Sequence, residues 1–390
     1  MSQVIISSND KAFQEHFQEK STVTVLSPGR INIIGEHLDY NDGFVLPAAI
    51  DKYICFSIAR NEENTFDFFA KDLEESFHWK GEQAFSPVQQ TWANYLLGVL
   101  RELQLKGINH LSAKLVFSSN IPMGAGLSSS AALSCGFAFA LNELFDLKLT
   151  KEEIALMGQK AEQKFAGVNC GIMDQFASVF GKKNQVIQLD CSTLEHHYFS
   201  ADLEDYQFLL IDSKVKHTHL TSGYNDRRNE MTEGFEILQK NLSNFSSFRD
   251  CTEEMLENLK DKFSETVFKR CHYVVKEMKR VETAIQAIQA KDFALLGQCM
   301  SETHKGLSEE YDVSCDELDF LVDFAQQENT ILGARMMGGG FGGCSINLIH
   351  KSAVDAFIPK IATAYRQHFG IDLQAYKIEI SDGTQLVSNK

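Results

Sequence analysis

The sequence predicts an α+β protein with two domains. Short runs of alternating apolar residues, typical of strands, and longer stretches typical of helices are mixed along the chain without strict alternation. This mixture favours an α+β fold over a doubly wound sheet. The length of 390 residues corresponds to two or three domains at roughly 150 residues each. Apolar residues make up 44% and charged residues 23%, which are values of an ordinary globular protein and exclude disorder.

The expected elements follow from the local patterns in chain order. Strands are expected at 22–27, 53–60 and 112–119, and then at 185–190, 207–212, 344–349 and 376–381. Helices are expected at 130–146, at 151–166 and over 283–300, within a third quarter that is mostly helical. A domain boundary is expected near 190–210, which divides the chain into residues 1–205 and 206–390.

Charge and cysteine content exclude several classes of protein. The net charge is −16, whereas binding to a phosphate backbone needs a basic surface, so nucleic acid is not an expected partner. The nine cysteines are scattered and contain no CxxC, which indicates reduced thiols in a cytoplasmic protein. The N-terminus lacks a signal-peptide pattern, and the most apolar stretch, 131–141, is too short to span a bilayer. We therefore expect neither export nor a membrane span.

Residues 122–133, PMGAGLSSSAAL, form the first candidate site. Gly124 and Gly126 permit a tight turn, and the serines at 128–130 then open a helix. The free N–H groups of a helix N-terminus can cradle a phosphate. The segment is not a Walker A loop, because it has no lysine. A capped helix after a glycine turn, without a ligand, is the alternative interpretation.

Residues 336–344, MMGGGFGGC, contain the pattern GxGxxG at Gly338, Gly340 and Gly343. A dinucleotide-binding loop follows a strand and opens a helix. This segment is expected to follow a helix and to open the strand at 344–349, so we do not expect NAD binding. The glycines still indicate a backbone that approaches a ligand closely, and a plain hairpin turn is the alternative.

Residues 28–47 place Arg30 beside a strand and then crowd Glu36, His37 and Asp39 into four positions. Carboxylates and an imidazole next to glycines suit the recognition of several hydroxyl groups. A metal site or a polar turn between strands is also compatible with this pattern. The three glycine-containing segments lie on both sides of the expected boundary, so we expect the site at the domain interface.

Together these segments resemble the GHMP family of small-molecule kinases. Residues 28–51 are similar to the galactokinase signature of that family, 122–133 to its phosphate-binding motif and 335–344 to its third, glycine-rich motif. Further matches lie at 92–99, 165–178, 222–230 and 301–319, so the resemblance covers nearly the whole chain. It implies an N-terminal domain like domain 2 of ribosomal protein S5 and a ferredoxin-like C-terminal domain, with the active site between them.

The resemblance also implies a reaction and its residues. ATP would phosphorylate the 1-OH of α-D-galactose, the first committed step of galactose catabolism, with Mg²⁺ as cofactor, in a protein that is expected to be a monomer. Asp174 would accept the proton of the sugar hydroxyl, and Arg30 would stabilise the transferred charge. The sugar would be bound by Glu36, His37, Leu38, Asp39, Gly171 and Tyr224, with Asp39 reading the axial 4-OH. ATP would be bound by Gly124, Ala125, Gly126, Leu127, Ser128, Ser129, Ser130 and Trp92, with Tyr95 as a further candidate near the adenine. The metal would be held by Ser130 and Glu162.

Two positions depart from the family pattern. Leu38 and Met337 stand where threonine is usual, and we expect Leu38 to act indirectly, through neighbouring groups.

Trp92 and Tyr224 can also be read as packing residues and Glu162 as part of a solvated helix face. Cys170 and the histidine pairs His196–His197 and His217–His219 are interpreted as structural.

Two other functions remain open at this point. One is a non-catalytic sensor of galactose and ATP, which the intact segment Ser129–Ala132 argues against. The other is a kinase of a different substrate, such as N-acetylgalactosamine, arabinose, mevalonate or homoserine. The cluster at 36–39 argues against the last two substrates.

Overall fold

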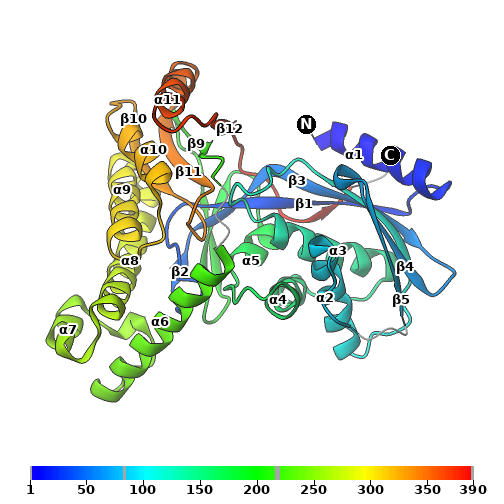
Figure 1. Cartoon of the computed structure of the whole chain (residues 1–390), viewed down its shortest axis with the longest axis horizontal. Helices are drawn as coiled ribbons and strands as arrows, with labels where there is room; N and C mark the ends of the chain where they lie inside the picture. Colours follow the sequence, from blue (N-terminus) through cyan, green and yellow to red (C-terminus); the bar gives the residue numbers. More distant parts are fainter. Residues whose placement is uncertain (1, 82–84, 216–219, 388–390) are drawn as a thin grey trace.

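A six-stranded sheet forms the framework of the first half of the chain (Figure 1). The computed structural model describes residues 2–81, 85–215 and 220–387, without the side chains of 220–222. The strand order is β13–β1–β3–β6–β4–β5, antiparallel except for the parallel pair β4 and β6. The bounds are Val23–Asn32 for β1, Pro47–Arg60 for β3, Thr65–Ala70 for β4, Glu75–Lys80 for β5, Ala113–Ser119 for β6 and Gln385–Leu386 for β13.

Helices cover both faces of this sheet. Helix α1 (Ser2–Phe17) lies alone on one face, and α2 to α5 lie on the other (Figure 1). Their bounds are Thr91–Leu105 for α2, Ser129–Phe145 for α3, Lys151–Ala161 for α4 and Met173–Phe180 for α5. A small sheet of β2 (Phe44–Val45), β7 (Gln185–Asp190) and β8 (His196–Ser200) leads towards the second half.

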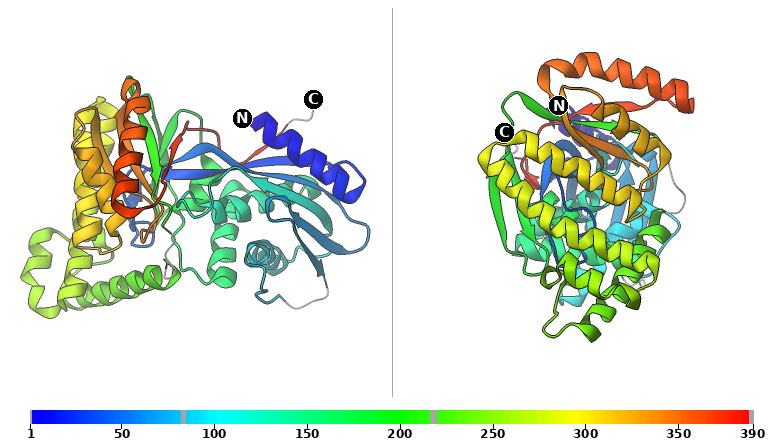
Figure 2. Two further views of the ribbon diagram at one scale, coloured as in Figure 1. Left: turned by 45° about the horizontal axis from the view of Figure 1, so that its top comes forward. Right: turned by 90° about the vertical axis from the view of Figure 1, so that its left-hand side faces the viewer.

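The second half is built on a four-stranded antiparallel sheet in the order β10–β11–β9–β12. The strands are β9 (Tyr206–Asp212), β10 (Ile331–Met336), β11 (Cys344–His350) and β12 (Gln374–Lys377). Helices fill the connections from β9 to β10 and from β11 to β12, which gives a ferredoxin-like topology. They are α6 (Leu220–Asn241), α7 (Glu253–Asn258), α8 (Glu265–Ala290), α9 (Phe293–Glu309), α10 (Asp316–Gln326) and α11 (Val354–Phe369). Figure 2 shows this half beside the end of the first sheet.

One continuous hydrophobic core joins the two halves. It runs from strands of the first sheet, such as β1 with Val25, to strands of the second, such as β11 with Leu348. A second apolar cluster packs α10 and α11 on the second sheet. Residues 385–386 return to the first sheet, where Leu386 pairs with Val25. The division at residue 205 stays a prediction, and the end of the chain crosses back over it.

Most expected elements are present, and three differ. The stretch 283–300 is broken at Lys291, which takes a left-handed conformation (φ +55°), and Asp292 then caps α9 by accepting from the N–H of Leu295. The expected strand 376–381 is shorter, because β12 ends at Lys377. The glycine-rich segment follows strand β10, so the expectation that it follows a helix was wrong. It links β10 to β11 as a hairpin loop.

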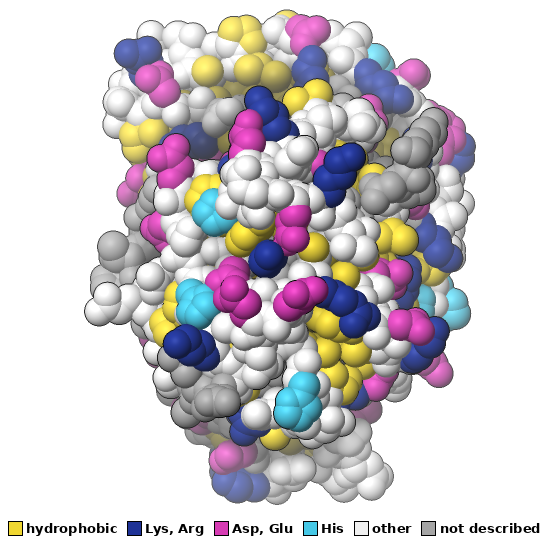
Figure 3. All heavy atoms as spheres, turned by 90° about the vertical axis from the view of Figure 1, so that its right-hand side faces the viewer, with side chains coloured by type: hydrophobic (Ala, Val, Ile, Leu, Met, Phe, Trp, Pro, Cys, Tyr) yellow, Lys and Arg dark blue, Asp and Glu magenta, His cyan; other side chains and the backbone are white. Residues whose placement is uncertain are grey.

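Surface features agree with the composition. The face formed by the far end of the first half carries interspersed acidic and basic side chains (Figure 3). None of the described helices combines the length and the apolar character needed to cross a bilayer.

Candidate active site

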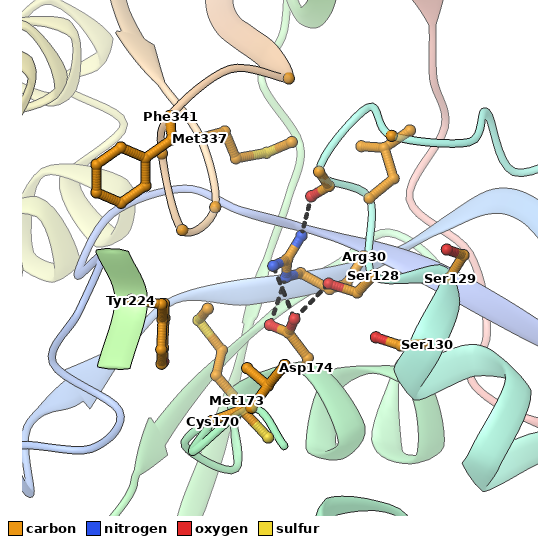
Figure 4. A pocket seen from close by; sticks show the side chains of 18 of the residues that line it. Arg30, Ser128, Ser129, Ser130, Cys170, Met173, Asp174, Tyr224, Met337 and Phe341 are labelled. Carbon is orange, nitrogen blue, oxygen red and sulfur yellow. Dashed lines mark hydrogen bonds and ion pairs between the residues drawn. The ribbon is translucent and has the colours of Figure 1, made fainter. Parts of the chain in front are cut away.

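A cavity of about 490 Å³ lies between the two halves. The end of β1, the segment 122–130, the start of α5, the start of α6 and the glycine-rich loop contribute its walls (Figure 4). The sequence-predicted residues that line it are Arg30, Glu36, His37, Asp39, Gly124, Gly126, Leu127, Ser128, Ser129, Ser130, Glu162, Asp174 and Tyr224. Segments as far apart in the sequence as Arg30 and Gly343 thus meet at one place.

Arg30 and Asp174 form the centre of this cavity (Figure 4). The guanidinium of Arg30 donates from Nε to Asp174 Oδ1 at 2.7 Å and from Nη2 to Oδ2 at 2.9 Å. Burial alone would lower the pKa of Arg30, but attraction to Asp174 and Glu36 outweighs it and raises the pKa. The hydroxyl of Ser128 donates a short hydrogen bond to Asp174 Oδ2. A permanently charged fork therefore holds the carboxylate in one orientation.

The segment 122–130 places backbone N–H groups at the start of α3. Gly124 and Gly126 have φ of +75° and +72°, which favours glycine, and Ser128 takes the left-handed conformation at φ +58° just before the helix begins. The carbonyl of Gly126 accepts from Arg30 Nη1 at 2.6 Å. The loop thus lies beside the Arg30–Asp174 pair, where phosphate oxygens could meet both N–H groups and a cation.

Glu162 and Ser130 form a second polar pair on the same side. Ser130 donates to Glu162 Oε1 at 2.9 Å, and the side-chain amide of Gln175 donates to Oε2 at 2.9 Å. Burial, together with repulsion from Asp174, raises the pKa of Glu162 to about 7. Among the described residues, no three His, Cys, Asp or Glu side chains gather in a way that would hold a metal ion. A buried carboxylate that forms no ion pair with any described residue nevertheless fits Mg²⁺, which commonly takes few protein ligands and relies on phosphates and water for the rest.

The opposite side of the cavity offers polar groups that lack partners. Asp39 makes no side-chain hydrogen bond with any described residue, and the buried Nε2 of His37 has none either. His37 Nδ1 lies 2.8 Å from the hydroxyl of Tyr40, which in turn lies 2.8 Å from that of Tyr311. Burial and the charge of Arg227 lower the pKa of His37 to about 3, so the ring is neutral at physiological pH. These free groups can bind hydroxyls of a ligand.

Position 171 requires glycine because it lies against Asp39, although Gly171 does not line the cavity. A Cβ atom at this position would lie 2.1 Å from Asp39 Oδ2, far inside van der Waals contact.

Leu38 packs into the core instead of the cavity and is fully buried. Its carbonyl accepts from the N–H groups of Asn41 and Gly43 and closes the turn. Leu38 therefore supports the loop through backbone contacts.

Trp92 lies in the core and not in the cavity wall. Its side chain is 8% exposed, and its indole N–H donates to Glu75 at 2.6 Å. Tyr95, one turn further along α2, does line the cavity, as does Met337. Ala125, within the segment 122–130, is fully buried. The roles of Trp92 and Tyr95 beside adenine stay predictions; of the two residues, Tyr95 is the one that lines the cavity.

Sequence reasoning missed Arg335, Tyr40 and Phe341 as parts of the site. Arg335 is fully buried directly behind it, and Phe341 lines the cavity on the same side as Tyr224 (Figure 4), close to Gly223. A buried arginine cannot be told from an exposed one by spacing, so no signal in a single sequence marks Arg335. Cys170 lines the cavity as a free thiol whose pKa is raised by burial. His196 packs on Phe176, and His217 and His219 lie outside the described residues.

The charge of Asp39 predicts a pH-dependent stability. Burial, with repulsion from Asp174 and Glu36, raises its pKa from 3.8 to about 7. The folded ligand-free protein binds this proton more tightly than the unfolded chain, so stability falls as pH rises from about 4 to about 7. At about 1.4 kcal/mol for each pKa unit the loss is at most about 4 kcal/mol. Urea unfolding at pH 5 and pH 7.5 should show a smaller difference for Asp39→Asn than for the wild type, and equal differences would contradict the account.

Comparisons with known proteins give the family. The model for the GHMP kinase N-terminal domain matches residues 94–182, that for the galactokinase galactose-binding signature matches 11–60, and that for the GHMP kinase C-terminal domain matches 284–367. The chain is 43% identical over 363 residues to the galactokinase of Thermotoga maritima, across 93% of this chain and 99% of the relative. The chain belongs to the galactokinase family of GHMP kinases. The galactokinase of Clostridium beijerinckii is 35% identical, across 96% of this chain and 97% of the relative.

Solved structures of this kinase family confirm the fold. The galactokinase of Lactococcus lactis in complex with galactose superposes with a TM-score of 0.93 at 32% identity, over 98% of this chain and 99% of that one. The mevalonate kinase of Methanococcus jannaschii shares the fold with a TM-score of 0.66 at 18% identity, over 92% of this chain and 98% of that one. The two-domain α+β architecture expected from the resemblance is therefore confirmed, and the chain is a kinase.

Proposed function

We propose that this enzyme transfers the γ-phosphoryl group of ATP to the 1-OH of α-D-galactose, giving α-D-galactose 1-phosphate and ADP. The observation that carries the proposal is the position of the Arg30–Asp174 pair. It lies between a loop shaped to bind phosphate and a set of polar groups without protein partners, all within one cavity. Membership in the galactokinase family supports the choice of sugar.

Asp174 would orient the attacking hydroxyl and accept its proton. Phosphoryl transfer passes through a loose transition state, so the proton can leave late and the acceptor need not remove it before the phosphoryl group moves. Arg30 keeps the carboxylate in place through two hydrogen bonds and would stabilise the negative charge of the transferred group. Ser128, which caps Asp174 in the ligand-free protein, would release the carboxylate oxygen to the sugar.

Ser130 and Glu162 are the residues that would hold Mg²⁺. When bound, the ion would neutralise charge on the β- and γ-phosphates. The loop that begins at Gly124 and the first residues of α3, Ser129 and Ser130, would donate their N–H groups to the phosphate oxygens. Glu162 is held by Ser130 and Gln175 at 2.9 Å each, so its carboxylate is oriented before ATP binds.

The sugar would be held by His37, Asp39 and Tyr224. The neutral imidazole of His37 lines the cavity with its buried Nε2 unpartnered, and the carboxylate of Asp39 makes no side-chain hydrogen bond with any described residue. Gly171 leaves room for Asp39 to point at the ligand. We propose that Asp39 accepts a hydrogen bond from the axial 4-OH, the group that distinguishes galactose from glucose.

A sugar panel tests the proposed function. Release of ADP from Mg-ATP should occur with galactose and be far slower with glucose, N-acetylgalactosamine, arabinose and mevalonate. Binding of galactose in calorimetry without turnover of any substrate would indicate a sensor. Turnover of another sugar would keep the reaction and change the substrate.

Asp39→Ala should reduce the preference for galactose over glucose. Losing a hydrogen bond to a charged acceptor costs about 1.5–3 kcal/mol, so the ratio of kcat/KM values should fall roughly ten- to a hundredfold. The measurement is kcat/KM for each sugar with saturating ATP. Asp51→Ala, which removes a carboxylate that does not line the cavity, is the control. An unchanged ratio would contradict the assignment of Asp39.

The nine cysteines form no disulfide, all being among the described residues. This supports the proposal that the enzyme works in a reducing compartment, the cytoplasm. We further propose that it works as a monomer, with galactose and ATP as its ligands.

A further inference from the structure

Arg335 is fully buried behind the cavity and belongs to β10 of the second half. Its guanidinium donates from Nε to the carbonyl of Ile33 at 2.9 Å and from Nη2 to that of Asn32 through a short hydrogen bond. From Nη1 it donates to Glu36 Oε1 at 3.0 Å and to its neighbour, the carbonyl of Met336, at 2.6 Å. One side chain of the second half thus holds the whole turn between β1 and the sugar-binding residues.

Glu36 uses both carboxylate oxygens inside the protein. Oε1 accepts from Arg335 and from the N–H of Gly338 at 2.8 Å, and Oε2 accepts from the amide of Asn32 at 3.0 Å. The residue is 1% exposed. Although Glu36 touches the cavity, its hydrogen bonds connect two loops. Asp39 and His37 of the same loop, in contrast, leave polar atoms free.

Gly338 also lies close to the segment 122–130. Gly338 approaches Gly126, because a Cβ atom at 338 would lie 3.4 Å from the carbonyl oxygen of Gly126. That same oxygen accepts from Arg30, which holds Asp174. Hydrogen bonds therefore link Arg335 through Glu36 to Gly338, and the close approach of Gly338 to Gly126 leads on to the Arg30–Asp174 pair.

We infer that Arg335 is a positioning residue that, through Glu36 and Gly338, sets the spacing between the sugar loop and the phosphate loop. The inference rests on the proposed function and adds to it how the two substrates are brought into register. Phosphoryl transfer depends on in-line placement of donor and acceptor, and a displacement of about 1 Å can cost roughly a hundredfold in rate. Removal of the Arg335–Glu36 ion pair should therefore lower kcat/KM for both substrates.

The test compares Glu36→Gln, Arg335→Met and the double variant with the wild type. Glu36→Gln keeps the shape and one acceptor oxygen and removes the charge, so it should fold even if Arg335→Met does not. We expect kcat/KM to fall about ten- to a hundredfold for galactose and for ATP alike, as is common when a residue that orients a site is lost. The double variant should lose no more than the worse single variant, because the two residues act as a unit.

Arg249→Met is the matched control. Arg249 makes a bidentate ion pair with Asp190, at 2.6 and 2.7 Å, outside the cavity. The Arg249→Met substitution should lower the melting temperature of the protein and leave both kcat/KM values unchanged when they are measured well below that temperature. The same pattern in Glu36→Gln and Arg335→Met would show a merely structural role and overturn the inference. A loss confined to galactose would make Glu36 a simple sugar ligand and also overturn it, whereas an inactive wild type would refute the proposed function instead.

Discussion

Replacing Asp174 with asparagine should lower kcat by about 10²- to 10⁴-fold, the usual contribution of a positioned general base. Asparagine keeps the size of the side chain and can still accept one hydrogen bond from Arg30. It cannot take up a proton from the sugar hydroxyl, and it lacks the charge that pairs with Arg30. The KM for galactose should change little, because the hydroxyl contacts of Asp39 and His37 remain. Single-turnover measurements with saturating Mg-ATP would report the chemical step itself.

Asp190→Asn is the control for this experiment. Asp190 has the same bidentate contact with an arginine, Arg249, so its substitution removes an ion pair of the same geometry at a place without substrate. The control should keep the wild-type kcat. A kcat for Asp174→Asn within about threefold of the wild type, far below the usual contribution of a base, would contradict the role of Asp174.

Replacing Arg30 with methionine should lower kcat by about 10³-fold or more, within the range of arginines that stabilise transferring phosphate. The guanidinium is 4% exposed and contacts both Asp174 and the carbonyl of Gly126. Its removal therefore takes away charge and releases the carboxylate. Arg30→Lys should recover only part of the rate, because an ammonium group supplies charge without the planar fork.

Rates of the two Arg30 variants, measured by ADP release, separate charge from geometry. Arg249→Lys and Arg249→Met provide the same pair of substitutions at the control ion pair, where both should leave kcat unchanged. Full activity in Arg30→Lys would mean that charge alone matters, and full activity in Arg30→Met would contradict the role of Arg30.

Local sequence patterns predicted the parts of the site that depend on local backbone chemistry. The glycines at 124 and 126 and the serines at 128–130 indicated a phosphate loop at a helix start, and α3 begins at Ser129. Glu36, His37 and Asp39 of the cluster at 36–39 line the cavity, and their binding of a sugar stays a prediction. Leu38 points into the core, while Asp39 faces the ligand side. Turn chemistry is local, so it can be read from a few adjacent residues.

Contacts between distant segments could not be read in this way. Asp174 and Arg30 are 144 positions apart, and only the family resemblance brought them together beforehand. Arg335 is separated from Asn32 by 303 positions, and although it opens the segment that resembles the third family motif, no role was predicted for it. Propensity also failed where tertiary contacts decide the outcome. The break at Lys291 falls within a stretch of good helix formers, and the two residues of β13 are a strand only because β1 pairs with them.

The central claim is that phosphate is transferred to the anomeric oxygen of galactose, and identification of the product tests it most directly. The purified chain would be incubated with Mg-ATP and galactose, and the product examined by ³¹P and ¹H NMR. The account predicts ADP together with a sugar phosphate whose phosphorus couples to the anomeric proton in the α configuration. A phosphorus coupled to protons at C6 or another carbon, or ADP and free phosphate without a sugar phosphate, would contradict it.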